Sequence, residues 1–168
     1  MDTTEQAVHD LAKKLGARLM MKGLKLATAE SCTGGWIAKV LTDMPGSSAW
    51  FEYGFVSYGN NAKTTMLGVH PTLIEKYGAV SAEVAEAMVA GALAASGAQL
   101  ALAVTGIAGP EGGTPDKPLG TVWFAFAGAG RGVVSACQQF EGDRDTVRRQ
   151  TVSTALTGVL KYLEKSGG

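Results

Sequence analysis

The chain has 168 residues, close to the ~150 that one domain typically contains. Apolar residues make up 46% of it and charged residues 18%, values typical of a globular protein and not of a disordered one. The 15 basic and 15 acidic residues cancel, which argues against a protein that neutralises many phosphates along a nucleic acid. We therefore expect one globular domain over residues 1–168, without a nucleic-acid partner.

Cysteine and histidine are scarce. The 2 cysteines, Cys32 and Cys137, and the 2 histidines, His9 and His70, lack the paired spacing of a zinc site, so no metal site is expected. Two distant cysteines form no disulfide framework, and the first ten residues lack the basic-then-apolar pattern of a signal peptide. Both features favour a cytoplasmic protein.

Residues 87–110 contain no charge and exceed the ~20 residues that cross a bilayer. The turn-forming sequence Ser96-Gly97-Ala98-Gln99 divides this stretch into two shorter elements. We therefore expect a buried helix followed by a buried strand, and no membrane span.

Helical and strand patterns alternate along the chain. Together they predict a three-layer α/β/α domain with a mixed, mostly parallel sheet, in which Gly130-Arg131-Gly132 joins the last two strands as a hairpin. The expected helices cover residues 4–22, 33–41, 60–67, 82–95 and 143–164, with a further helix opened by Pro71, and the expected strands cover 24–30, 50–58, 100–106, 121–128 and 133–140.

Ser31 follows the first expected strand and precedes a helix. The backbone N–H groups of Thr33, Gly34 and Gly35 would lie at the positive end of that helix. A hydroxyl at this position is well placed for nucleophilic attack, with those N–H groups stabilising the oxyanion. The alternatives are that Ser31 or Thr33 only caps the helix, or that the neighbouring Cys32 is the nucleophile.

A serine nucleophile needs a base, and neither histidine is suitably placed. Lys63 falls in the first turn of the short helix after the second strand, where burial and helix polarity would both lower its pKa. A lysine with a pKa lowered towards ~7 can accept the serine proton. The alternative is an ordinary solvated lysine.

Two further segments could hold a ligand. Gly106 and Gly109 follow a buried strand and would allow the backbone to approach an anion such as a phosphate, although an ordinary long turn also fits. Arg144, at the start of the last helix, could bind a phosphate or carboxylate, whereas Arg148 and Arg149 could form a solvated face.

Several blocks of sequence, in this order, closely resemble the CinA carboxy-terminal family over about residues 5–164. The blocks are Ala29-Glu30-Ser31-Cys32-Thr33-Gly34-Gly35, Tyr58-Gly59-Asn60 with Lys63, Gly78-Ala79-Val80-Ser81, Thr105-Gly106-Ile107-Ala108-Gly109-Pro110, Gly120-Thr121-Val122 and Gly142-Asp143-Arg144.

The resemblance implies a stand-alone amidase domain, an expected homodimer, that hydrolyses nicotinamide mononucleotide to nicotinate mononucleotide and ammonia in pyridine-nucleotide salvage. It implies a Ser/Lys mechanism with no metal or other cofactor. By position, Ser31 is the nucleophile and Lys63 the general base. Tyr58, counted among the catalytic residues, and Thr105 line the site and support the dyad or the ligand. Arg144 is the residue expected to bind the substrate phosphate. The main alternative is a non-catalytic, regulatory nucleotide-binding module, because the family also contains inactive members.

Overall fold

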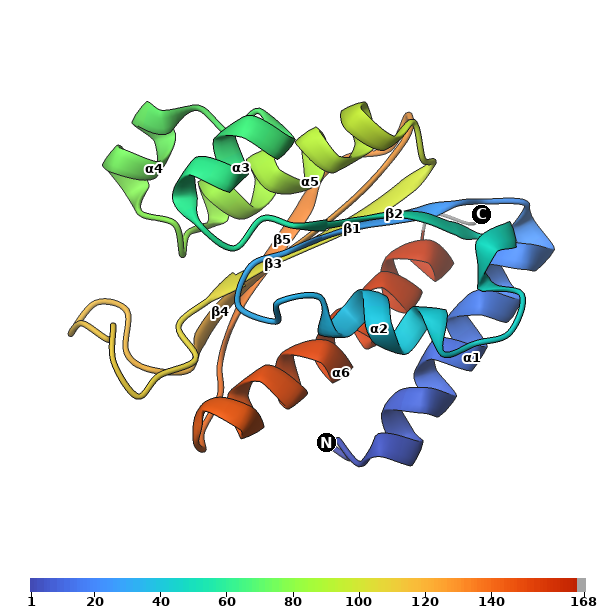
Figure 1. The fold of residues 1–168 in the computed structure, drawn as a ribbon, viewed down its shortest axis with the longest axis horizontal. Coiled ribbons are helices and arrows are strands. Elements are labelled where there is room, and N and C mark those ends of the chain that lie inside the picture. Colours follow the sequence, from blue (N-terminus) through green and yellow to red (C-terminus); the bar gives the residue numbers. More distant parts are fainter. Residues whose placement is uncertain (166–168) are drawn as a thin grey trace.

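A computed structural model describes residues 1–165 and contains one five-stranded sheet between two helical layers (Figure 1). The last three residues of the expected domain, 166–168, lie outside the described residues. The strands are β1 (Leu26–Glu30), β2 (Phe51–Val56), β3 (Leu100–Gly106), β4 (Thr121–Gly128) and β5 (Val134–Gln139).

The strand order is β2-β1-β3-β4-β5. Strand β1 pairs in parallel with β2 and β3, whereas β4 pairs antiparallel with both β3 and β5. All strands of the sheet except β4 therefore point the same way. The predicted α/β fold with a mixed, mostly parallel sheet is confirmed, as is the hairpin between β4 and β5.

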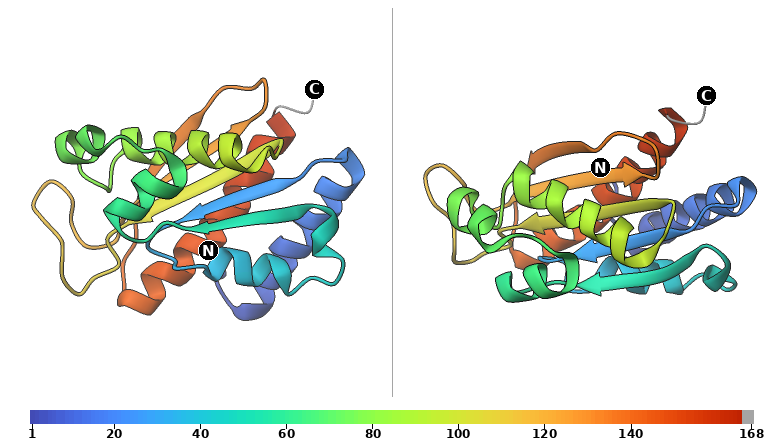
Figure 2. Two further views of the ribbon diagram at one scale, coloured as in Figure 1. Left: turned by 45° about the horizontal axis from the view of Figure 1, so that its top comes forward. Right: turned by 90° about the horizontal axis from the view of Figure 1, so that it is seen from above.

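Each face of the sheet is covered by helices. On one face lie α1 (Glu5–Lys22), α2 (Trp36–Thr42) and α6 (Arg144–Lys165), and on the other lie α3 (Asn60–Leu67), α4 (Pro71–Tyr77) and α5 (Ala82–Ser96) (Figure 1). Helix α5 runs along the sheet over β3 and β4 (Figure 2).

The alternation of side chains along the central strands explains the two layers. In β1 and β3 the large Leu26, Leu100 and Leu102 belong to the core under α1, α2 and α6. The intervening alanines, such as Ala101 and Ala103, belong to the core under α5. Small side chains on that face allow α5 to pack close to the sheet. The charge-free stretch 87–110 is thus the end of α5 followed by β3, and no helix within residues 1–165 is long and apolar enough to cross a membrane.

One expected helix begins later than its sequence predicts. The helix expected over 33–41 is α2, which starts at Trp36, because residues 31–35 form turns. Gly34 and Gly35 have φ angles of +58° and +101°, a left-handed backbone that does not continue a helix. A short 3-10 helix over Ser47–Ala49 was not predicted.

Gly91 of α5 explains why α3 can lie so close to α5. A Cβ atom at Gly91 would stand 1.9 Å from the carbonyl oxygen of Leu67, the last residue of α3, so only glycine permits this approach. The contact packs the end of α3 against α5. It therefore helps to fix the position of α3, which carries Lys63.

Candidate active site

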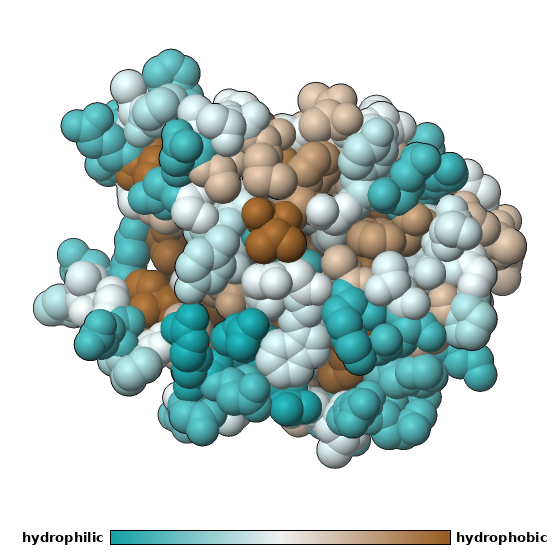
Figure 3. All heavy atoms as spheres, viewed as in Figure 1, coloured by the Kyte–Doolittle hydropathy of each residue, from teal (hydrophilic) through white to brown (hydrophobic). Residues whose placement is uncertain are grey.

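The three junctions singled out in the sequence meet at one cavity of about 220 Å³ at the carboxyl ends of β1 and β3. Figure 3 shows the molecule hollowed on this side, between α4 and the loop over residues 107–120. Parallel strands place their carboxyl ends at the same edge of a sheet, which is where ligands bind in open α/β folds. The cavity is lined by Ser31, Cys32, Tyr58, Asn60, Lys63, Ala79, Val80, Thr105, Gly106, Ala108 and Arg144.

Ser31 and Lys63 are in direct contact. The Nζ atom of Lys63 donates to the Oγ atom of Ser31 over 3.0 Å, and Ser31 Oγ in turn donates to the backbone carbonyl of Tyr58 over 3.2 Å. The same carbonyl accepts a second hydrogen bond from Lys63 Nζ, over 2.9 Å. A single peptide oxygen thus holds both the hydroxyl and the amine in place.

Lys63 is buried without an opposite charge. Only 1% of the residue is exposed, and within residues 1–165 no carboxylate forms a salt bridge with it. Burial lowers the pKa of its amine from the ordinary 10.5, because an ammonium loses its hydration there. The expected position of Lys63, in the first turn of α3, is confirmed, and the residue is buried there.

The turn after Ser31 holds its peptide groups differently from the helix end expected from sequence. The N–H of Gly34 donates to the carbonyl of Ser31 over 3.0 Å, so it is not free to bind an oxyanion. Thr33, Gly34 and Gly35 do not line the cavity, and Thr33 is fully buried. Among residues 1–165, no acceptor is found for the backbone N–H of Cys32 or of Thr33. Of the two residues, Cys32 lines the cavity, and the N–H of Thr33 is the next unpaired one along the turn.

Glu30 supports this turn, and sequence reasoning assigned it no role. Its carboxylate is 1% exposed and accepts hydrogen bonds from Thr33 Oγ1 over 2.6 Å, from the N–H of Ile37 over 2.8 Å and from the N–H of Ala38 over 3.0 Å. Burial raises the pKa of this carboxyl, while the three hydrogen bonds oppose the rise. Glu30 therefore caps α2 and ties the nucleophile turn to it. A carboxylate in a strand that is otherwise apolar or hydroxylic was the available signal.

Thr105 and Gly106 line the cavity from the end of β3. The hydroxyl of Thr105 donates to the carbonyl of Ala79 over 2.9 Å, which fixes the 79–80 wall and leaves the Thr105 oxygen free to accept. A Cβ atom at Gly106 would stand 2.7 Å from a methyl group of Val122, so glycine here serves the contact with β4. Asn60, Ala79, Val80 and Ala108 also line the cavity. They belong to the blocks that carry the family resemblance, but the sequence analysis gave them no individual role.

Arg144 brings a cation to the rim of the cavity. Its guanidinium donates to the carbonyl of Gly109 over 2.8 Å and to the hydroxyl of Tyr58 over 3.1 Å. Both acceptors are neutral, and among the described residues no carboxylate pairs with Arg144. Gly109 does not line the cavity and serves to orient this arginine. The side chain of Tyr58 is exposed, and it contacts Arg144, whereas its carbonyl contacts Ser31 and Lys63.

Cys32 is poorly suited to be a nucleophile. The residue is 6% exposed, and burial raises the pKa of its thiol to about 12. A thiolate would therefore be almost absent at neutral pH. Neither His9 nor His70 lines the cavity, and within residues 1–165 no group of three or more His, Cys, Asp or Glu side chains could hold a metal ion.

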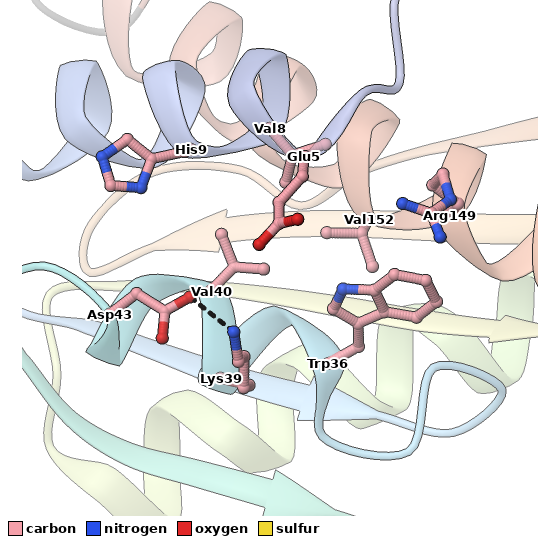
Figure 4. Close-up of a pocket in the computed structure, with 9 residues that line it drawn as sticks. All are labelled: Glu5, Val8, His9, Trp36, Lys39, Val40, Asp43, Arg149 and Val152. Carbon is pink, nitrogen blue, oxygen red and sulfur yellow. Dashed lines mark hydrogen bonds and ion pairs between the residues drawn. The ribbon is translucent and has the colours of Figure 1, made fainter.

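A second cavity, of about 260 Å³, lies between α1, α2 and α6 (Figure 4). It shares no lining residue with the cavity at Ser31. Its polar side chains include the exposed ion pair between Lys39 and Asp43, at 2.8 Å, and the ring of Trp36 closes it beside Arg149. It is lined by no serine, threonine or cysteine, so it holds no counterpart of Ser31.

Comparison with known proteins places this arrangement in a family. The sequence model that describes the CinA C-terminal domain family matches residues 8–163 of the chain. The chain belongs to the CinA C-terminal domain family. The family resemblance read from the sequence blocks is thus confirmed.

Two relatives named as amidohydrolases are similar to the chain over nearly their full length. The chain is 58% identical to a Pseudomonas putida protein named nicotinamide-nucleotide amidohydrolase PncC, over 92% of this chain and 96% of that one. It is 50% identical to the protein of the same name from Escherichia coli (strain K12), over 91% and 93% of the two chains. The crystal structure of a competence/damage inducible protein from Agrobacterium tumefaciens matches with a TM-score of 0.91 and 41% identity, over 96% of this chain and 98% of that one.

Proposed function

We propose that this protein is a nicotinamide-nucleotide amidohydrolase that converts nicotinamide mononucleotide to nicotinate mononucleotide and ammonia, with Ser31 as nucleophile and Lys63 as base. The observation that carries the proposal is the 3.0 Å contact between Ser31 Oγ and a buried Lys63 Nζ without a counterion. The names of the relatives that match nearly the whole chain support the substrate class.

Catalysis begins with neutral Lys63. A neutral amine has two N–H bonds and one lone pair, so it can donate to the Tyr58 carbonyl and still accept the proton of Ser31. As Ser31 Oγ bonds to the carboxamide carbon, its proton passes to Lys63. The carbonyl oxygen becomes an oxyanion, and the free N–H groups of Cys32 and Thr33 are the donors that would bind it.

Lys63 then completes both halves of the reaction. The protonated amine gives its proton to the amide nitrogen as the carbon–nitrogen bond breaks, so ammonia leaves and an ester on Ser31 remains. A water molecule attacks this ester while Lys63 takes its proton and returns one to Ser31 Oγ. The sum is the amide plus water giving the acid plus ammonia, with no redox step.

The cationic rim suits a nucleotide. Arg144 carries a charge that no carboxylate neutralises among residues 1–165, and it lies on the same cavity as Ser31. A guanidinium binds the oxygens of a phosphate with strong charge-assisted hydrogen bonds. In the proposal Arg144 binds the phosphate and Thr105 accepts from the carboxamide. A homodimer in the cytoplasm, as expected from the resemblance and the composition, remains part of this proposal.

Trapping the ester tests the mechanism. Wild-type protein mixed with nicotinamide mononucleotide and hydroxylamine should form the hydroxamate of the nicotinate nucleotide, because hydroxylamine competes with water for the acyl-enzyme. Acid quenching followed by peptide mass spectrometry should find the acyl group on the peptide that contains Ser31. Nucleotide binding without ammonia or hydroxamate would favour the alternative, a non-catalytic nucleotide-binding module.

A further inference from the structure

We infer that Arg148, on α6, is a positioning residue that orients the backbone N–H groups beside Ser31 for the developing oxyanion. The inference rests on the proposed function, since it assigns a role within that reaction. Arg148 touches neither the cavity nor Lys63. Sequence reasoning placed it on a solvated helix face.

Arg148 bonds two successive carbonyls of the nucleophile turn. Its Nε atom donates to the carbonyl of Cys32 over 3.0 Å, and its Nη2 atom donates to the carbonyl of Thr33 over 3.2 Å. The side chain is half-buried between α6 and α2. The rigid fork of a guanidinium suits two neighbouring acceptors, which a single ammonium cannot match in the same way.

Peptide planarity carries this contact to the N–H groups. In a trans peptide the C=O and N–H bonds of one unit point in opposite directions. The Cys32 carbonyl belongs to the same unit as the Thr33 N–H, so holding that carbonyl towards α6 turns the Thr33 N–H away from α6. Helix α6 covers one face of the sheet, and α3, which carries Lys63, covers the other (Figure 1).

The next peptide unit locks the turn. The Thr33 carbonyl is held by Arg148, and the Gly34 N–H of the same unit donates to the Ser31 carbonyl over 3.0 Å. With this unit tied at both ends, the N–H groups of Cys32 and Thr33 are left as the unpaired N–H groups of the turn. The positive charge on the carbonyl side also polarises these peptides and strengthens their N–H groups as donors.

Arg149 provides a matched control. Both arginines lie against the ring of Trp36, with distances from guanidinium to ring centroid of 5.5 Å for Arg148 and 5.2 Å for Arg149. Among residues 1–165, however, the Arg149 side chain bonds only Asp145, one turn earlier on α6, over 3.2 Å. Figure 4 shows it beside Trp36 at the second cavity. The two residues share charge, helix and stacking partner, and differ in the contact with the turn.

The test compares Arg148→Met with Arg149→Met. Loss of one oxyanion donor lowers kcat about 10²–10³-fold in known hydrolases, so we expect about a 10- to 100-fold loss of kcat in Arg148→Met, where the donors are misaligned but present. KM for nicotinamide mononucleotide should change less than about threefold, because ground-state binding does not use these donors. Arg149→Met should match the wild type. Added guanidinium should partly restore Arg148→Met, and Arg148→Lys should fall between the two.

The pH dependence and amide exchange separate positioning from collapse of the site. The acid limb of the rate, set by Lys63, should stay in place in Arg148→Met, while hydrogen exchange at residues 32–34 should quicken there and not in Arg149→Met. Equal kcat in the two variants, or a shifted acid limb with raised KM, would overturn the inference. If the wild type releases no ammonia, the proposed function fails, and unchanged exchange at 32–34 would overturn the positioning role independently.

Discussion

Lys63 reaches Ser31 over 3.0 Å from a position where only 1% of the lysine is exposed. Within residues 1–165 no carboxylate compensates the charge of Lys63, and the one other hydrogen bond of its Nζ atom is to the backbone carbonyl of Tyr58. A buried amine in such surroundings favours its neutral form. In the proposed mechanism this contact pairs the Ser31 hydroxyl with a neutral amine that takes its proton, and the proposed roles of the other residues follow from it.

The rate should depend on pH through Lys63. Burial lowers the pKa of this amine below 10.5, and only its neutral form is a base. We therefore expect kcat/KM to be low in acid and to rise with pH through a single ionisation below 10.5. Lys63→Met should lose at least about 10²-fold in kcat and lose this acid limb from the residual rate. Lys39→Met, which removes an exposed lysine, should keep both. A limb that persists in Lys63→Met would assign it to another group.

Glu30→Gln should destabilise the fold. Three groups donate hydrogen bonds to the Glu30 carboxylate, which only accepts. In glutamine an NH₂ group replaces one of the two oxygens, so at least one of these donors would face another donor. Leaving a buried donor unpaired costs about 1–3 kcal/mol, and we expect that loss in the free energy of unfolding measured with urea. Glu5→Gln is the control, because Glu5 is exposed in the first turn of α1. Equal stability of the two variants would show that Glu30 does not hold the start of α2.

The local parts of the structure could be predicted from sequence. The ranges 60–67, 100–106 and 121–128 agree with α3, β3 and β4, because helical period and apolar runs are properties of neighbouring residues. The start of α2 could not be predicted, since the left-handed angles of Gly34 and Gly35 override the helical pattern.

The contacts of the site depend on the tertiary fold. Ser31, Lys63, Thr105 and Arg144 could be named from their junctions and from the family resemblance, and the structure brings them to one cavity. The Tyr58 carbonyl could not be foreseen, because a backbone atom leaves no trace in residue type. Arg148 was hidden for another reason: it lies 115 residues from the Thr33 carbonyl that it bonds.

Arg144→Met should weaken binding of the nucleotide and spare the nucleoside. A hydrogen bond to a charged group contributes about 1.5–3 kcal/mol, which corresponds to about a 10- to 100-fold rise in KM. We expect this rise with nicotinamide mononucleotide, and little change with nicotinamide riboside, which has no phosphate. Steady-state kinetics with both substrates measure the difference. An equal rise in KM with the two substrates would show that Arg144 does not bind the phosphate.

Cys32→Ser should remain active. The Cys32 thiol is buried, and its pKa of about 12 leaves almost no thiolate at neutral pH. We expect kcat within about threefold of the wild type, and iodoacetamide should not inactivate the wild-type protein at neutral pH. The N–H of residue 32 is unchanged by this substitution. A loss above about 10²-fold would instead support a cysteine nucleophile.

The most direct test of the central claim is ammonia release from nicotinamide mononucleotide by the wild type, Ser31→Ala and Ser57→Ala. Ser57 is the matched control, because it is a fully buried serine that does not line the cavity and whose hydroxyl donates to the Glu30 carbonyl over 3.4 Å. We predict release by the wild type and by Ser57→Ala, with a loss of at least about 10³-fold in Ser31→Ala. Near-normal release by Ser31→Ala would contradict the Ser/Lys account.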